Sequence, residues 1–347
     1  METVEQVYLD RIKLMRITAA LFVTLCAALM ALMITYCNKK VVVISNYEEE
    51  ISSSEVAAKT KNNVTWKIKT SASKGSNIHI PVESTDIEYD MDYVNKIFTV
   101  KIPDDKGKFY MENVPYGDFE DVKDVTGRFD GEYVTYTMPM NRPLEPKLEL
   151  TGEEAVFSFA SISHEKPIVL LDPGHGGNAI GNKAGGLLEK EVVLKIARKV
   201  EELSKDKDFK VILTRNIDRK VGMGECISIV NIVKADYYIS LHLDVDVEDS
   251  KTFGMRASYN ADYYRDGFEN VDFADKLLRS VVSSTANKAV ELFEAGEEEL
   301  VLKVLKIPAA TLYLGYISNT SEAGLLSEDA YIEKIARGIV DALSECE

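Results

Sequence analysis

Hydrophobic residues along this chain follow three different patterns. From Ile17 to Cys37 no charged side chain interrupts an apolar run. Between residues 77 and 160, short stretches alternate apolar and polar positions and are separated by turn residues. From residue 166 onward, continuous apolar stretches of strand length alternate with amphipathic stretches of helical period. The patterns predict a membrane-spanning helix, a small antiparallel β domain and an α/β domain, in that order.

The third pattern predicts an α/β fold whose mostly parallel sheet is flanked by helices. Strands that are buried on both faces give continuous apolar runs, as these do. We expect strands at residues 167–172, 209–215, 236–243, 254–259 and 309–317, and helices at residues 189–205, 220–234, 271–294 and 329–344. Ligands of such sheets bind outside the carboxyl ends of the strands, so a site in residues 166–347 is expected at that edge.

The second pattern predicts a small β domain over residues 77–160, with a sandwich as one possible arrangement. Strands are expected at residues 77–82, 96–102, 132–137, 147–150 and 155–159. Asp-Asp-Lys-Gly at 104–107 and Phe-Asp-Gly at 129–131 supply turn residues between them. No motif in this region identifies a ligand, so a spacer domain is one interpretation.

The apolar run at residues 17–37 would form a helix about 31 Å long, enough to cross a bilayer core. Three basic residues precede it, and an acidic stretch follows at residues 48–50, which predicts a cytosolic tail at residues 1–16. A cleaved signal peptide is the alternative, but the run is long and residues 34–37 lack a small-residue cleavage site. We expect a single-pass cell-membrane anchor, a polar linker at residues 38–76 and an extracellular remainder.

Charge and cysteine content narrow the classes of partner. A formal net charge of −16 argues against nucleic acid, whose phosphates attract basic surfaces. The four cysteines are scattered and none has metal-ligand spacing, which argues against a disulfide scaffold and a cysteine zinc site.

Two of the four histidines stand at the ends of predicted strands. His175 follows a strand in a glycine-rich turn, His242 closes another strand, and Glu189 opens the helix between them. Two imidazoles and a carboxylate with no nearby cysteine suit a catalytic zinc that keeps a position open for water. Taken singly, each residue also has an ordinary explanation, as a hydrogen-bonded histidine or an acid facing a helix dipole.

Five segments carry a resemblance to a known family. They are Leu-Asp-Pro-Gly-His-Gly-Gly at 171–177, Glu-Lys-Glu-Val-Val-Leu at 189–194, Thr-Arg at 214–215, Ser-Leu-His at 240–242 and Gly-Tyr-Ile-Ser-Asn at 315–319. Residues 166–347 resemble zinc-dependent N-acetylmuramoyl-L-alanine amidases of the type 3 family. The resemblance implies a peptidoglycan hydrolase whose zinc is held by His175, Glu189 and His242. The β domain faintly resembles modules that position such amidases on the cell wall.

The family pattern also suggests roles for other residues. Its ligand is the first acid of the helix, which implies Glu189 and leaves Glu191 as an ordinary helix acid; only one of them can face the site, because residues two apart point about 200° away from each other. An arginine at the position of Arg215 shapes the family's cleft, although an exposed arginine that binds a helix or loop carbonyl is the other interpretation. Asp172 and Asn182 are candidates for hydrogen bonds to a ligand residue or to substrate.

One position departs from the family. Its members carry a glutamate two residues before the glycine of the segment at 315–319, where it acts as the general base, and this chain has Tyr313 there. A phenol with a pKa near 10 cannot take a proton at neutral pH, although it can donate a hydrogen bond. Asp244, two residues after His242, is the nearest acid in sequence that could substitute. The chain is therefore expected to be an amidase, or a catalytically weakened homologue that binds peptidoglycan or regulates a partner hydrolase. Spacing specifies the metal and not the substrate, so a zinc peptidase acting on another amide is a third interpretation.

Overall fold

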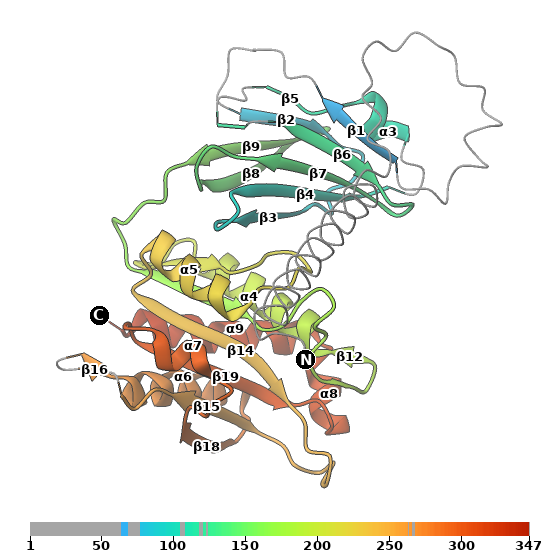
Figure 1. Ribbon diagram of the computed structural model, residues 1–347. Helices are drawn as coiled ribbons and strands as arrows, with labels where there is room; N and C mark the ends of the chain where they lie inside the picture. The colour runs from blue at the N-terminus through green and yellow to red at the C-terminus, as the bar shows by residue number, and fades with distance from the viewer. Residues whose placement is uncertain are drawn as a thin grey trace, which may run out of the picture. The chain divides into compact units, whose positions relative to one another are not determined.

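The computed structural model describes residues 64–68, 77–104, 108–117, 121–122, 124–262, 264–265 and 268–346 (Figure 1). The predicted anchor at residues 17–37 lies outside these ranges, as do the predicted tail and most of the linker. Among the described residues, no helix has the length and hydropathy needed to span a membrane. The chain divides into a first unit, Met1–Lys67, whose described residues belong to strand β1 (Val64–Ile68), and a second unit, Ile68–Glu347. The second unit holds both domains considered below.

Two antiparallel sheets form the β domain. One has the order β5 (Tyr116–Gly117), β2 (Asn77–Pro81), β9 (Glu154–Ala160), β8 (Glu145–Thr151). The other contains, in order, β6 (Val125–Phe129), β7 (Tyr133–Pro139), β4 (Ile97–Pro103) and β3 (Glu88–Asp92), and a short helix, α3 (Lys108–Glu112), follows β4. Burial alternates along β4 and β7, as the sequence pattern predicts. Phe98 of one sheet meets Phe157 of the other edge to face at 5.0 Å between ring centroids, so the two sheets pack as a sandwich.

Strand β3 was not expected from the sequence. Its residues, Glu-Tyr-Asp-Met-Asp, include three acids, which are depleted in strands. Its backbone nevertheless pairs with β4 along its whole length, from Glu88 opposite Lys101 to Asp92 opposite Ile97. Tertiary pairing thus outweighs local propensity here.

Six strands form the central sheet of the α/β domain. Their order is β13 (Lys210–Leu213), β10 (Ile168–Pro173), β14 (Tyr237–Asp244), β19 (Ala309–Tyr316), β15 (Met255–Tyr259), β18 (Ala289–Glu294). Every neighbouring pair is parallel except β15 with β19, which confirms the prediction of a mostly parallel sheet. All six residues of β10 are buried, as a strand covered on both faces requires.

Helices flank this sheet (Figure 1). Three of them, α4 (Glu189–Leu203), α6 (Asn270–Thr285) and α9 (Asp329–Ser344), share one hydrophobic core with alternate residues of the strands, including Val169, Leu171 and Ile239. Helix α5 (Met223–Val233) buries Ile229 and Val233 outside that core. Two short helices, α7 (Leu300–Val304) and α8 (Thr320–Leu326), precede and follow β19, and two small hairpins pair β11 (Lys183–Ala184) with β12 (Leu187–Leu188) and β16 (Tyr264–Arg265) with β17 (Phe268–Glu269).

The helix expected at residues 271–294 was wrong in its second half. Helix α6 ends at Thr285, because Ala286 turns into the left-handed conformation with φ 52°. The chain then forms β18, which pairs with β15 at the edge of the sheet. As an edge strand, β18 is largely exposed and so lacks the continuous apolar run that marks the buried strands.

Candidate metal centre

The site lies where two neighbouring parallel strands end. Pro173 of β10 is in register with Leu241 of β14, so the turn that carries His175 lies beside His242. Glu189, the first residue of α4, enters the same space. One nitrogen from each histidine and one oxygen of the carboxylate all lie within 4.8 Å of one another. The structure therefore brings together the three residues that the sequence pattern singled out.

Glu189 is the centre of this cluster, and only 1% of its surface is exposed. Its Oε1 lies 2.9 Å from Nδ1 of His242 and 3.2 Å from Nε2 of His175, and accepts a hydrogen bond from the backbone N–H of Leu243 at 2.9 Å. Its Oε2 accepts from the N–H of Asn182 at 2.7 Å. Burial by itself would raise the pKa of this carboxyl, but hydrogen bonds from both histidines and the backbone outweigh burial and hold the pKa well below its usual range. The carboxylate is therefore ionised and ready to bind a cation.

The two imidazoles meet edge to face, with ring centroids 4.9 Å apart and planes at 83°. About 30% of the His175 side chain and 27% of the His242 side chain are exposed, so the cluster opens to solvent on the histidine side. His175 has a left-handed backbone with φ 64°. A Cβ on the preceding residue, Gly174, would lie 2.3 Å from Cε1 of His242, and so only glycine allows this approach.

These residues fit a metal ion by the chemistry of their donors. Two imidazole nitrogens and one buried, ionised carboxylate oxygen converge from three different elements, and protein zinc ions in catalytic sites take such ligand sets. Glu191 is exposed, whereas Glu189 is buried at the site, so the first acid of the helix is the one that faces the histidines.

Asn182 and Asp172, the two residues suggested for hydrogen bonds near the site, make different contacts. Asn182 holds it together, because its N–H binds Glu189 and its Nδ2 donates to the carbonyl of Leu243 at 3.0 Å. Asp172 is buried and accepts a hydrogen bond from the hydroxyl of Tyr238 at 2.8 Å. It serves the packing of the sheet.

Arg215 is completely buried, so the exposure expected of it as a carbonyl-binding arginine was wrong. Its Nε donates to the carbonyl of Pro173 at 2.8 Å, and its Nη2 donates to the carbonyls of Gly174 and Lys190 at 2.9 Å each. Burial lowers the pKa of this arginine to about 10, so it remains charged at neutral pH. The guanidinium ties the His175 turn to the first turn of α4.

Tyr313 lies beside His242, with which it is in register across β14 and β19, and the two ring centroids are 6.0 Å apart. Phe293 lies 6.0 Å from the same tyrosine ring, and the guanidinium carbon of Arg256 lies 5.1 Å from its centroid. Burial, followed by the negative charge of Glu299, raises the pKa of Tyr313 well above its ordinary value. The position that holds the base in the family thus holds a protonated phenol here. No sequence motif pointed to these neighbours, because they come from β15, β18 and the start of α7.

Asp244 is the acid expected to substitute for the base. A β-bulge separates it from His242 on β14, and its carboxylate forms an ion pair with Arg256. It is not part of the cluster of His175, Glu189 and His242. The structure thus pairs this acid with a cation of β15, which lies beyond β19 in the sheet.

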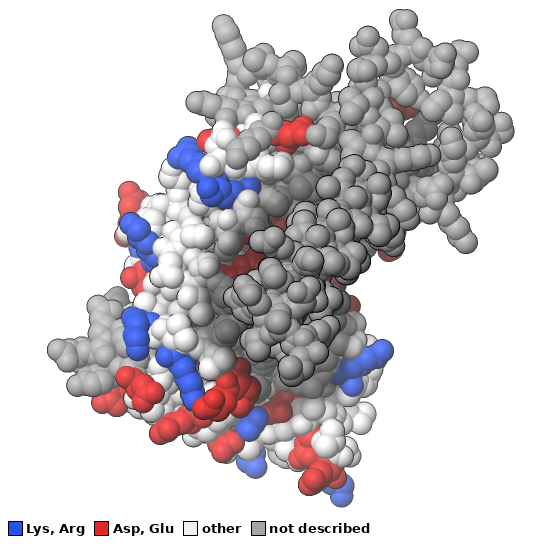
Figure 2. All heavy atoms as spheres, viewed as in Figure 1, with Lys and Arg blue, Asp and Glu red and all other residues white. Residues whose placement is uncertain are grey.

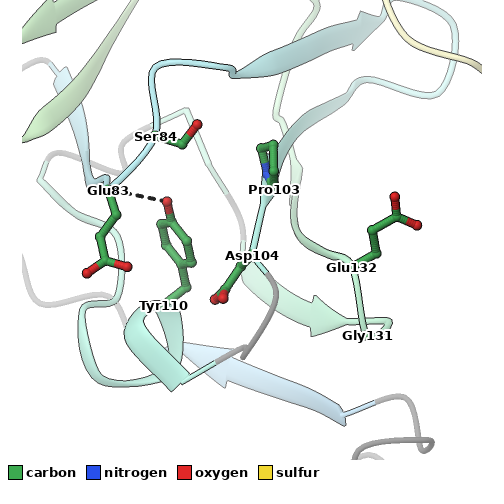
Figure 3. Close-up of a pocket in the computed structure, with 7 residues that line it drawn as sticks. All are labelled: Glu83, Ser84, Pro103, Asp104, Tyr110, Gly131 and Glu132. Atoms are coloured by element: carbon green, nitrogen blue, oxygen red, sulfur yellow. Dashed lines mark hydrogen bonds between the residues drawn. The ribbon is translucent and has the colours of Figure 1, made fainter.

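A separate hollow of about 430 Å³ lies in the β domain. Figure 3 shows the hydroxyl of Tyr110 pointing at the backbone of Glu83, whose N–H donates to it at 3.2 Å. Asp104 and Glu132 also line the hollow, but no histidine or cysteine does, so it differs chemically from the metal cluster. On the face drawn in Figure 2, acidic and basic side chains are interspersed.

Comparison with known protein families shows that residues 169–345 match the family described as N-acetylmuramoyl-L-alanine amidase. A germination-specific N-acetylmuramoyl-L-alanine amidase of Bacillus subtilis (strain 168) is 30% identical over 186 residues, which cover 50% of this chain and 76% of the relative. The probable cell wall amidase LytH of Staphylococcus aureus is 30% identical over 181 residues, 50% of this chain and 56% of the relative. All three proposed ligands fall within the matched residues.

One solved structure is similar to part of this chain. The N-acetylmuramoyl-L-alanine amidase from Clostridium difficile 630 is 27% identical, and the alignment covers 52% of this chain and 95% of that one with a TM-score of 0.48. The alignments of both relatives and of this structure each cover about half of the chain.

Proposed function

Because the chain belongs to the N-acetylmuramoyl-L-alanine amidase family, we propose that it hydrolyses the amide between N-acetylmuramic acid and L-alanine in peptidoglycan. The observation that carries the proposal is the convergence of His175, Glu189 and His242 within 4.8 Å at the carboxyl edge of the sheet. The names of the relatives, one of them a probable cell wall amidase, support the same class of substrate.

Zinc is the proposed cofactor, and these three residues would hold it. When bound, zinc polarises the amide carbonyl and lowers the pKa of a bound water. The chain's own part is to keep the carboxylate of Glu189 ionised and to aim both imidazoles at it from two strand ends. Arg215 and Asn182 hold those strand ends in place.

Tyr313 determines the rate of amide hydrolysis that we expect. Its hydroxyl stays protonated at neutral pH, so it can donate a hydrogen bond to an oxygen of the substrate but cannot remove a proton from water. Loss of a general base typically lowers a rate by about 10²–10⁴-fold. We therefore propose slow turnover, with Asp244 kept from the role of base by its ion pair with Arg256.

The same observation favours a second function. A chain that keeps the metal ligands but replaces the base with a half-buried, protonated phenol would still bind peptidoglycan, or a partner hydrolase, without cleaving it at a useful rate. This second function differs from the first in turnover and not in the site, so one experiment separates them.

The deciding experiment incubates the full-length protein with zinc and purified peptidoglycan. Hydrolysis at the proposed bond releases stem peptides that begin with a free amino group on L-alanine, which mass spectrometry detects. Release that a chelator and His175→Ala both abolish supports the amidase. If the protein instead sediments with peptidoglycan and no peptide appears, the binding function holds and the amidase proposal fails.

We further propose that residues 17–37 anchor the protein in the cell membrane with the amidase domain outside. The support is the length of the apolar run and the basic residues before it. Protease added to intact cells should degrade the chain beyond residue 38. Full protection from the protease would contradict this orientation.

A further inference from the structure

A buried acid of the β domain contacts the loop that follows β13 in the α/β domain. Asp90 in strand β3 is only 4% exposed. Its Oδ1 accepts a hydrogen bond from the backbone N–H of Asn216 at 2.6 Å, and its Oδ2 accepts from Nε of Arg219 at 2.6 Å. Both partners lie more than 120 positions further along the chain. A buried carboxylate is costly unless its partners are fixed, so this contact holds the loop in one conformation.

All three nitrogens of the Arg219 guanidinium donate hydrogen bonds, and one of these bonds goes to Asp90. Besides Asp90, it donates through Nη1 to Glu225 at 2.5 Å and through Nη2 to the carbonyl of Thr214 at 2.8 Å. Glu88, on the same strand, provides a second link, because Arg198 donates to Glu88 at 3.0 Å and to Oδ1 of Asn216 at 2.9 Å. Two acids of β3 therefore hold residues 214–219 from one side.

The other side of the same loop supports the turn that carries His175. Oδ1 of Asp218 accepts from the N–H of Gly177 at 2.8 Å. The carbonyl oxygen of Arg219 lies where a side chain on Gly176 would begin, since a Cβ there would be 2.0 Å from it. Arg215, also on the loop, binds the carbonyls of Pro173 and Gly174. The backbone on both sides of His175 is therefore set by this loop.

We propose that Asp90 is a positioning residue for the metal centre. It fixes residues 214–219, these residues fix the turn at 173–177, and the turn aims His175 at Glu189. The β domain is then a structural part of the metal centre. This inference rests on the proposed metal site.

The test uses the full-length chain with Asp90→Asn, which keeps the shape of the side chain and removes its charge toward Arg219. Glu145→Gln is the matched control, because the Glu145–Lys210 pair at 2.7 Å also joins the two domains but contacts the start of β13 and not the loop. Zinc affinity is measured by competition with a chromogenic chelator. Hydrogen exchange of the amides at residues 174–177 is measured in the metal-free protein.

The zinc dissociation constant of Asp90→Asn should rise by about 3- to 10-fold, less than the roughly 10–100-fold typical when a direct partner of a metal ligand is lost, because Asp90 acts through the loop. Exchange at residues 174–177 should become faster, and Glu145→Gln should match the parent in both measurements. Equal zinc affinity and equal exchange in Asp90→Asn and the parent would overturn the inference.

A parent protein that binds no zinc would defeat the proposed metal site, but the exchange measurement would still decide whether Asp90 orders the turn. If Asp90→Asn does not fold, Arg219→Lys takes its place, because lysine keeps the charge and loses two of the three contacts of Arg219. Arg219→Lys is expected to weaken zinc binding and speed exchange at 174–177. Parent-like values for both would overturn the inference in the same way.

Discussion

Helix α4 carries a poorly exposed glutamate near each end, and the two differ in charge behaviour. Glu189 opens the helix, and its pKa is held low by the two histidines and two backbone N–H groups. Glu201 lies in the last full turn, where burial raises the pKa to about 7. Lys205 and Arg198 lower the pKa of Glu201 by less than burial raises it, and the charge of Glu145 adds to the increase. Both residues are glutamates of α4, but the groups that lower their pKa values differ.

The difference shows that burial raises the pKa of a carboxyl on this helix unless hydrogen-bond donors outweigh it. An acid that remains ionised out of water needs donors arranged around it in advance, which is what a metal ligand requires. An acid without them raises its pKa and lowers the stability of the fold when it ionises. The surroundings of the glutamate at the start of α4 therefore suit the proposed metal ligand.

The largest effect is expected when Glu189 or either of its two histidine partners is replaced. His175→Ala, His242→Ala and Glu189→Gln should each reduce bound zinc from about one ion per chain to nearly none, because three protein ligands are the least that a catalytic zinc site uses. Metal analysis of protein purified without chelator measures this.

Two variants are the controls. Glu201→Gln changes the other acid of the same helix, and His164→Ala removes a histidine that contacts the carbonyl of Val233 outside the site. Both should keep the full zinc content. A zinc-free parent protein would refute the metal centre itself.

A second carboxylate can be placed beside the cluster. Tyr313→Glu would put an acid next to His242, and turnover should rise by up to about 10²–10⁴-fold if a base is all that is missing. Peptide release from peptidoglycan measures the change, and Tyr313→Phe, which keeps the ring, should stay as slow as the parent. If the parent already works at a high rate and Asp244→Asn abolishes it, the base is Asp244 and our assignment is wrong.

The first turn of α4 can be destabilised without changing Glu189 itself. Arg215→Lys would lose most of the hydrogen bonds that join the His175 turn to the carbonyl of Lys190 in the first turn of α4. The free energy of unfolding should fall by about 2–3 kcal/mol, since buried carbonyls lose their donors. Denaturant unfolding of the metal-free protein measures this. Arg337→Lys, at an exposed pair with Glu333, should change stability by less than about 0.5 kcal/mol.

The smallest effect concerns Glu201 and pH. Its pKa is about 7 in the fold, against an ordinary value of 4.5, so the folded chain binds this proton more tightly than the unfolded chain does. The parent should therefore lose stability as the pH rises from about 4.5 to 7. Glu201→Gln, which cannot ionise, should be more stable than the parent by about 1–2 kcal/mol at pH 8 and equal to it near pH 4. Thermal unfolding at both pH values measures this, and an equal difference at the two would show that the effect is not ionisation.

The order of strands and helices in the α/β domain, and the place of its site, follow from the sequence. Buried strands such as β10 and amphipathic helices such as α9 differ in period, and a period is a local property of the chain. The glycine-rich turn at His175 and the strand end at His242 also point to one edge, because parallel strands place their carboxyl ends together. The sequence did not predict β3 or β18, because β3 is rich in acids and β18 is largely exposed.

Only the tertiary structure decided which partners the polar residues meet. Arg215 looks like a surface arginine in the sequence, and its burial depends on carbonyls about 25 and 41 positions away. Asp90 reaches Asn216 across 126 positions, a contact that no local pattern encodes. The same holds for the two glutamates of α4, because the charge of a buried acid is set by donors brought from distant elements when the chain folds.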